Sequence, residues 1–593
     1  MPTSAAHGPG RAPVTRLALL ALVLLVVVTT VVVATSRRSS APLAATPASF
    51  PAGRPTAAPA GLVSAGAPAP AQSARPNIVT IVTDDMRTDD LRWMPQVRRL
   101  LAGGGLTFRN SFSPYPLCCP ARASLLTGQL AHNHRVLSHR PPFGFGSFDD
   151  SRTLATSLNT SGYNTLFLGK YLNGYGLQRS RVTGRPSFRY VPPGWTEWYA
   201  AVSRPPRSGY RSGGTYNYWN TLLNVNGRID DSHRGQYQTT VLGRLARSLV
   251  RTYHRSRKPF FLYLAPVAPH FGSPREDDDP RPTLDPATGR RLTIKTPARP
   301  RWVRGRFDRE IPRASGMPAD GGPSEADVRD KPEPIRTLPE LNDWEREAVR
   351  TSTRQRAEAL FVLDREVARL LATLRATDEL DNTVVMLTSD NGYFLGEHRM
   401  RQGKVKPHEP SLRVPFLIAG KGIPRGSRFD PVSTPDLTAT VLDLAGARPP
   451  RVPDGRSVLP SVRRDRGWRA PVVTEGLEPA RVFRGPPAIP GFRDARTTSG
   501  VRTAQWKYVR YRDGHGELYD LDADPNELVS RFGDPRYAAV QARLHRVWLS
   551  SKDCVGRACR AQLPAGLQSG PGRTRAGTEE QADGVQARYG YRR

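Results

Sequence analysis

The chain has 593 residues, with 87 Lys and Arg against 53 Asp and Glu, which gives a formal charge of +34. Single hydrophobic cores stop growing near roughly 250–300 residues, so this length predicts one large domain with a smaller unit attached. The positive charge favours acidic partners such as sulfated glycans, anionic polymers or lipid headgroups. Arg is spread along the chain without an aromatic-interleaved basic run or a nucleic-acid motif, which argues against a nucleic-acid partner.

The N-terminal segment has the pattern of an export signal. Leu17–Ala34 is an uncharged, mainly apolar run that follows Arg11 and Arg16 and is just long enough to cross a bilayer. We therefore expect residues 1–38 to be an uncleaved membrane anchor with the body of the protein outside the cytoplasm. A cleaved signal peptide, and hence a secreted protein, is the alternative. Residues 39–74 are rich in Ala, Pro and Ser and are expected to form an extended tether.

Two β-branched apolar runs of strand length, residues 77–83 and 382–388, each end in acidic or amide side chains. The first is followed by the Asp84-Asp85 pair and the second by Ser389 and the Asp390-Asn391 pair. Runs of this kind are typical of strands buried on both faces of a parallel sheet, where ligands bind at the carboxyl ends. If the strands are neighbours, three carboxylates and an amide oxygen meet there, and such hard donors suit Ca²⁺ or Mg²⁺ rather than zinc.

Residues 118–122 read Cys-Cys-Pro-Ala-Arg and are followed by Thr127-Gly128, which has the form C-x-P-x-R-x(4)-T-G. This motif resembles the signature of type I sulfatases, a branch of the alkaline phosphatase superfamily. The resemblance implies that Cys118 is oxidised to formylglycine by a formylglycine-generating enzyme. It also implies that one divalent metal, usually calcium with magnesium as the alternative, is held by Asp84, Asp85, Asp390, Asn391 and the modified Cys118.

Further segments of that family occur in the expected order. Gly169-Lys170-Tyr171-Leu172-Asn173 is similar to the G-K-W-H-L-G segment, Ala268-Pro269-His270 to A-P-H, and Gly403-Lys404 with Glu409 to K-x(4)-E. The implied catalytic residues are Cys118, Arg122, Lys170, His270 and Lys404. The cations would hold the negative sulfate oxygens, and His270 would protonate the leaving oxygen or contact the sulfate.

One position departs from the family pattern. The histidine of the G-K-W-H segment falls at Leu172, or at Asn173 if the register moves by one, and neither side chain is a normal base. The proton acceptor for release of sulfate is therefore left open. His132, His134 and His398 lie near the motifs and are candidates for this acceptor, although a structural or substrate-contacting role is favoured for each. We expect His134, His398 and Asn173 as substrate contacts.

The motifs are closest to those of N-acetylglucosamine-6-sulfatases and extracellular heparan endosulfatases, which share the K-Y-L-N form. The segments at 117–120, 131–136 and 191–195 add to this likeness, which implies a 6-O-sulfated glucosamine unit as substrate. Two alternatives stay open. One is a phosphonate monoester or phosphodiester hydrolase of the same superfamily, and the other is a protein that binds sulfated glycans without turnover.

The expected fold is α/β, with a large, mixed but mostly parallel sheet flanked by helices and a smaller C-terminal α+β subdomain. We assign residues 75–455 to the catalytic domain, 456–561 to the subdomain and 562–593 to a disordered tail. Apolar spacing predicts a long helix over 342–377, and residues 273–339 read as a surface insertion near the mouth of the pocket. In an exported protein, Cys554 and Cys559 are expected to form a short-loop disulfide.

Overall fold

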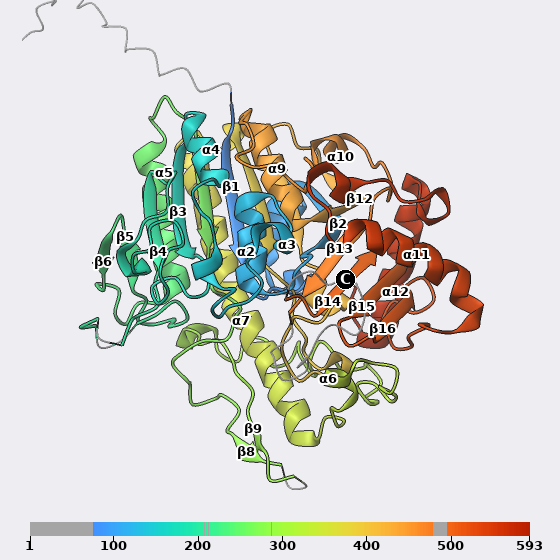
Figure 1. Cartoon of the computed structure of the whole chain (residues 1–593). Helices are drawn as coiled ribbons and strands as arrows, with labels where there is room; N and C mark the ends of the chain where they lie inside the picture. The colour runs from blue at the N-terminus through green and yellow to red at the C-terminus, as the bar shows by residue number, and fades with distance from the viewer. Residues whose placement is uncertain (1–74, 207, 211–212, 286–287, 478–494, 593) are drawn as a thin grey trace, which may run out of the picture. The chain divides into compact units, whose positions relative to one another are not determined.

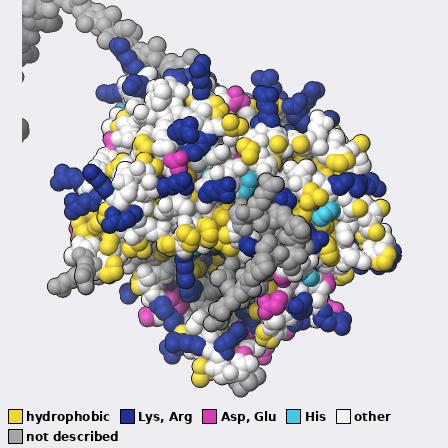
Figure 2. All heavy atoms as spheres, viewed as in Figure 1, with side chains coloured by type: hydrophobic (Ala, Val, Ile, Leu, Met, Phe, Trp, Pro, Cys, Tyr) yellow, Lys and Arg dark blue, Asp and Glu magenta, His cyan; other side chains and the backbone are white. Residues whose placement is uncertain are grey.

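A ten-stranded mixed sheet forms the centre of the computed structural model, which describes residues 75–206, 208–210, 213–285, 288–477 and 495–592. The predictions for residues 1–38 and 39–74 lie outside the described residues. Among the helices of the described ranges, none has both the length and the apolar character needed to span a bilayer. On the face shown in Figure 2, Lys and Arg side chains are scattered rather than gathered over one element.

The strand order of the large sheet places the two predicted acidic strands side by side at its centre. β1 and β10 pair in parallel over their whole length, and β1 also pairs in parallel with β7. The antiparallel pairs involve β11, β5 and β6, so the sheet is mixed but mostly parallel through its middle, as predicted. In spatial order the strands are β12 (Gly426–Ser433), β2 (Gly105–Phe112), β11 (Phe416–Gly420), β10 (Thr383–Ser389), β1 (Asn77–Thr83), β7 (Phe260–Ala265), β3 (Asn164–Lys170), β4 (Glu197–Ala201), β5 (Leu223–Val225) and β6 (Arg228–Asp230).

Helices cover both faces of this sheet, which explains why its central strands are apolar on both sides. Ile78 and Val82 of β1 pack in one cluster with α2 (Cys118–Thr127), α4 (Leu154–Thr160) and α9 (Thr434–Ala445). Val79 and Ile81 point to the other face, where they pack with α5 (Gln238–Tyr253) and α7 (Asp343–Ala376). The shorter α-helices are α1 (Pro95–Val97), α3 (Ala131–His134), α6 (Glu333–Arg336), α8 (Glu409–Leu412) and α10 (Leu459–Arg463).

The long helix α7 matches the helix predicted over 342–377. Asn342 caps its first turn by accepting a hydrogen bond from the backbone N–H of Glu345, and the Glu345 carboxylate accepts one from the backbone N–H of Asn342. Leu360, Leu363 and Val367 lie on its buried face, as their spacing predicts. This stripe belongs to the core.

A second, antiparallel sheet forms the C-terminal α+β unit beside the large sheet (Figure 1). Its strands are β13 (Val472–Gly476), β14 (Thr498–Arg502), β15 (Trp506–Tyr511) and β16 (Gly516–Asp520). α11 (Ala538–Ser551) packs on it through Leu544 and Trp548. The predicted Cys554–Cys559 disulfide is present just after this helix.

The prediction of a disordered tail over 562–593 is wrong for most of that segment. Pro571–Tyr589 forms α12, which buries Val585 and Tyr589. Polar contacts rather than an apolar stripe hold it: Asn110 donates to the Thr578 hydroxyl at 2.8 Å, and Arg502 donates to Gln581 at 3.0 Å. Because such contacts leave no periodic apolar signal, the sequence pattern did not reveal the helix.

The segment from 273 to 339 is an insertion with little regular structure, as predicted, but its described part is well anchored. It contains the short hairpin of β8 (Thr283–Leu284) and β9 (Arg291–Leu292), which Figure 1 shows extending beyond the large sheet. The buried guanidinium of Arg299 binds Glu276 and, at 2.8 Å, Glu358 of α7. This ion cluster ties the insertion to the helix that covers the sheet.

Candidate active site

The carboxyl ends of β1 and β10 bring the two acidic pairs into contact. The backbone N–H of Asp85 donates to Asp390 Oδ1 at 3.1 Å, and Asn391 Nδ2 donates to Asp85 Oδ1 at 2.7 Å. Asp84, Asp85, Asp390 and Asn391 are all fully buried. Thr83 and Ser389 are paired at the ends of the two parallel strands. The residues that follow them therefore lie together at the same edge of the sheet.

Cys118 lies at this edge, in the first turn of α2. Its Sγ is 3.2 Å from Asp84 Oδ1 and 3.8 Å from Asp85 Oδ1. Burial, and then the charges of Asp390 and Asp84, raise the pKa of the Cys118 thiol well above its ordinary value. The unmodified side chain is therefore a neutral thiol and a poor nucleophile.

Three cationic side chains surround the same point. Lys170 Nζ donates to Asp84 Oδ2 at 2.6 Å, and Lys404 Nζ contacts Asp85 and lies 2.7 Å from Cys118 Sγ. Arg122, one turn along α2 from Cys118, donates through Nε to Asp390 Oδ2 at 2.8 Å. Burial alone would raise the pKa of the Asp84 carboxyl, but Lys170 and then His270 hold that pKa below its usual range.

His270 reaches the cluster from the loop after β7. Its Nε2 is 3.6 Å from Asp85 Oδ2, and its Nδ1 is 2.6 Å from the carbonyl oxygen of Phe271. The ring stacks on Tyr216 with centroids 4.4 Å apart. Burial lowers the pKa of His270, against the opposing effects of Asp84 and Asp85. The carbonyl contact orients the ring so that Nε2 faces the cluster.

The donor set fits a hard divalent cation. Ligand atoms of Asp84, Asp85, Cys118 and His270 lie within 4.8 Å of one another. Within the described ranges, Asp85 Oδ2 and Asn391 Oδ1 are buried without a hydrogen-bond partner. Burial of a polar oxygen atom costs free energy unless a cation or a hydrogen-bond donor contacts it. Three carboxylates with an amide oxygen suit Ca²⁺ or Mg²⁺ as that cation.

A cavity of about 660 Å³ lies beside this cluster. His270 and Lys404 line its inner end, together with Asn173 and Tyr216, and the insertion at 273–296 supplies much of its wall. Asn173 Nδ2 donates to the Tyr216 hydroxyl at 2.7 Å, while within the described residues its Oδ1 is buried without a partner. Of the three expected substrate contacts, Asn173 is thus at the cavity.

His139 also lines the cavity and was not predicted. Its Nε2 has no hydrogen-bond partner among the described residues. Burial, and then the charges of Lys404 and Lys170, hold its pKa well below the ordinary value, so the imidazole is neutral. No motif includes His139, and no spacing pattern in the sequence distinguishes it from its neighbours.

The structure does not bring the other two expected histidine contacts to the cavity. His134 Nε2 is 3.0 Å from the Ser124 hydroxyl, and burial lowers its pKa to about 3. His398 is buried against Glu325 of the insertion, with Nδ1 2.7 Å from Oε2. Both have structural partners, because sequence proximity to a motif does not decide which way a side chain points.

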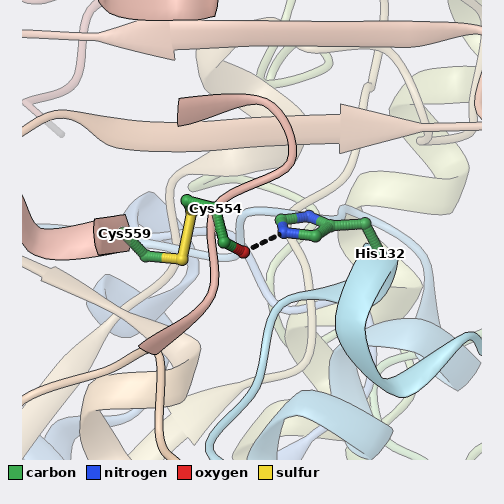
Figure 3. A group of neighbouring side chains, drawn as sticks. All are labelled: His132, Cys554 and Cys559. Atoms are coloured by element: carbon green, nitrogen blue, oxygen red, sulfur yellow. Dashed lines mark hydrogen bonds between the residues drawn. A yellow bond between two sulfur atoms is a disulfide. The ribbon is translucent and has the colours of Figure 1, made fainter. Parts of the chain in front are cut away.

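Two further residues named near the motifs are structural as well. His132 bonds Glu475 through Nδ1 and the carbonyl oxygen of Cys554 through Nε2, as Figure 3 shows for the second bond. Since Cys554 is in the disulfide, this group is no metal site. Glu409 is buried with Lys507 of β15, 2.9 Å away, so it joins the loop that carries Lys404 to the small sheet.

Comparisons with known proteins agree with this geometry. A family model described as "Sulfatase" matches residues 76–447, and one described as "N-sulphoglucosamine sulphohydrolase, C-terminal" matches residues 396–553. The N-acetylglucosamine-6-sulfatase of Homo sapiens is 28% identical over 82% of this chain and 86% of its own length. The extracellular sulfatase SULF-1 homolog of Drosophila melanogaster is 31% identical over 66% of this chain, but this match spans only 31% of that protein.

Solved structures share the fold. The protein BT4656, in complex with its substrate D-glucosamine-2-N,6-O-disulfate, matches with a TM-score of 0.57 at 21% identity, over 80% of this chain and 97% of that one. A phosphonate monoester hydrolase from Silicibacter pomeroyi matches with a TM-score of 0.56 at 21% identity, over 84% of this chain and 99% of that one. At these identities the likeness establishes the alkaline-phosphatase-like architecture alone.

Proposed function

Since the chain belongs to the sulfatase family and is a sulfuric ester hydrolase, we propose that it removes sulfate from a sulfated sugar by means of formylglycine formed from Cys118. The observation that carries this proposal is the position of Cys118 Sγ, which lies beside the Asp84 carboxylate and the Lys404 ammonium at one buried point. A neutral thiol held there is poorly suited to attack sulfur. The hydrate of an aldehyde supplies a hydroxyl nucleophile and a second hydroxyl whose deprotonation releases the sulfate.

Asp84, Asp85, Asp390 and Asn391 would hold a Ca²⁺ ion, with Mg²⁺ as the alternative. When bound, such an ion supplies positive charge that stabilises the anionic transition state and makes a neighbouring hydroxyl more acidic. The unpartnered Asp85 Oδ2 and Asn391 Oδ1 support this assignment. Arg122 holds Asp390 in place through its 2.8 Å contact and would thereby position one ligand of the ion.

The cationic side chains bind and orient the sulfate group. Lys170 is buried, Lys404 keeps 9% of its side chain exposed, and both are held by aspartates, so their ammonium groups are fixed before the substrate arrives. Preorganised charges in a site shielded from water stabilise developing negative charge without reorganisation. Tyr216, whose ring lies 4.9 Å from Lys170 Nζ, helps to set the position of that lysine.

His270 is proposed to protonate the leaving oxygen. Because Nδ1–H donates to the Phe271 carbonyl, the proton that the ring can give up is the one that Nε2 carries in the imidazolium form, and Nε2 faces the cluster at the cavity. The names of the relatives, with the 6-sulfatase likeness of the motifs, favour 6-O-sulfated glucosamine as the sugar. The extracellular relative also supports export, with residues 1–38 as anchor or signal.

The second candidate function is hydrolysis of a phosphonate monoester or phosphodiester, favoured by the fold shared with the phosphonate monoester hydrolase. Parallel assays on an aryl sulfate and an aryl phosphodiester separate the two, and we expect the higher kcat/KM on the sulfate. A large preference for the diester would overturn the proposed reaction. The third reading, glycan binding without turnover, loses its support because the chain belongs to an enzyme family and keeps every expected ligand.

A further inference from the structure

We propose that Arg291 and Lys295 form a subsite for a second anionic group of the substrate, apart from the sulfate ester that is cleaved, an inference that rests on the proposed sulfatase activity. The preferred substrate is then a sugar ester with at least two anionic groups. The second group is a sulfate or a carboxylate on the same sugar or on its neighbour.

Residues 291–296 alternate between exposed and buried side chains, and Ile294 and Thr296 of the buried set also border the cavity. Leu292, Ile294 and Thr296 are buried, with 4%, 8% and 5% of their surface exposed. Arg291 and Lys295 are exposed and line the cavity. Because successive side chains of an extended segment point to opposite sides, Arg291 and Lys295 extend away from the buried set and toward solvent at the cavity.

Hydrogen bonds hold this segment in place. The Gln402 side chain accepts from the backbone N–H of Lys295 at 2.9 Å and donates to its carbonyl oxygen at 3.0 Å. The backbone N–H of Gly272 donates to the Thr296 carbonyl oxygen at 3.0 Å. Gln402 precedes the catalytic Lys404 by two residues and Gly272 follows His270 by two, so the wall is bonded to both catalytic loops.

The charges along the cavity form two zones. His270 and Lys404 occupy the inner end, and Arg275, Arg291 and Lys295 lie on the insertion. Asp279, the acidic residue of this wall, is buried, accepts a hydrogen bond from the Thr296 hydroxyl at 2.8 Å and lies 3.8 Å from the Arg299 guanidinium, which balances its charge.

The outer zone, formed by Arg275, Arg291 and Lys295, begins next to the reacting groups. Lys295 Nζ is 4.9 Å from the centroid of the Phe271 ring, and Phe271 is the residue after His270. A sulfate ester bound at the inner end therefore leaves the rest of its sugar between the two zones. A single anion fills one zone, whereas a second anion on the substrate pairs with Arg291 and Lys295. Each pairing at such an exposed rim is worth up to roughly fivefold in affinity, so two pairings together can exceed tenfold.

The test measures binding in a Cys118→Ala background, which does not require turnover. Calorimetry compares 6-O-sulfo-N-acetylglucosamine with two dianionic probes: glucosamine-2-N,6-O-disulfate, and a disaccharide of 6-O-sulfated N-acetylglucosamine with a uronic acid. We expect at least one dianionic probe to bind about tenfold or more tightly than the monoanion. The probe that gains affinity identifies the second group as sulfate or carboxylate.

Arg291→Gln with Lys295→Gln should reduce this preference to within about twofold. Arg281→Gln with Arg290→Gln is the matched control, because it removes two positive charges from exposed residues of the same insertion that do not line the cavity. That variant should keep the full preference, and equal melting temperatures show that the variants are folded. Equal binding of all three probes by the Cys118→Ala protein, or a preference that survives loss of both cations, overturns the inference. Failure of the unsubstituted enzyme to hydrolyse aryl sulfate would instead overturn the proposed reaction.

Discussion

Replacement of His270 by Ala should reduce the hydrolysis of a sugar sulfate far more than that of an activated aryl sulfate. A positioned general acid contributes about 10²–10⁴ in rate, equivalent to about 2.7–5.4 kcal/mol in the barrier. His270 is placed to supply this, because the 2.6 Å contact of Nδ1 with the Phe271 carbonyl and the stacking on Tyr216 hold Nε2 toward the cluster. A sugar alkoxide needs a proton as it leaves, whereas an activated phenolate does not.

The assay is kcat/KM for both substrates, with Tyr216→Phe as the control. That variant keeps an aromatic ring beneath His270 and removes only the hydroxyl that accepts from Asn173, so both substrates should lose a similar, small factor. For His270→Ala we expect at least a 100-fold loss on the sugar sulfate and about tenfold or less on the aryl sulfate. Equal losses would place His270 in sulfate binding and refute its role as the acid.

Asp390→Ala should abolish turnover and metal binding, as measured by activity assays and elemental analysis. Added Ca²⁺ should not restore normal rates, because a hard oxygen ligand has been removed. A metal content like that of the unsubstituted protein would contradict the assigned site. The pKa of Glu475 is about 2, because His132 and Arg496 lower it against the effect of burial. The folded pKa of Glu475 lies below its unfolded value of 4.5. Its ionisation therefore adds about 3 kcal/mol to the free energy of unfolding above pH 4.5, and this stabilisation is lost as the pH falls toward 2. Glu475→Gln should therefore lower the melting temperature at pH 7, and this decrease should become smaller as the pH falls below 4.5. A difference in melting temperature between the two proteins that stays constant with pH would argue against the pairing of Glu475 with His132 and Arg496. Deletion of residues 1–40 should convert a membrane-bound activity that resists alkaline carbonate into a soluble one, whereas secreted protein that begins shortly after Ala34 would indicate a cleaved signal.

The centre of the fold and most of the site could be predicted because their signals are local. The apolar runs at β1 and β10 end in their acidic pairs within a few residues, and the rule for parallel sheets then predicts that the two ends meet. Cys118 and Arg122 are one helical turn apart, so a short motif determines their relation. Side chains beside such motifs were less predictable: Glu325, far along the chain, binds His398 and keeps it from the cavity.

The internal contacts of the cavity wall, which the sequence predicts only as a surface insertion, and the C-terminal helix could not be predicted for a different reason. The insertion is held by contacts between distant residues, such as Lys295 with Gln402 and Arg299 with Glu358, and these leave no periodic pattern. α12 likewise depends on polar contacts and a few buried side chains rather than on an apolar stripe. His139 becomes notable only when the fold places its unpartnered Nε2 at the cavity.

Mass spectrometry of the peptide that contains Cys118, from protein made together with a formylglycine-generating enzyme, tests the proposed nucleophile most directly. We expect residue 118 to carry the aldehyde, with oxygen in place of sulfur, and Cys119 to be unchanged. Activity should rise in proportion to the modified fraction. Fully active protein in which Cys118 is an unmodified cysteine would contradict the proposed chemistry.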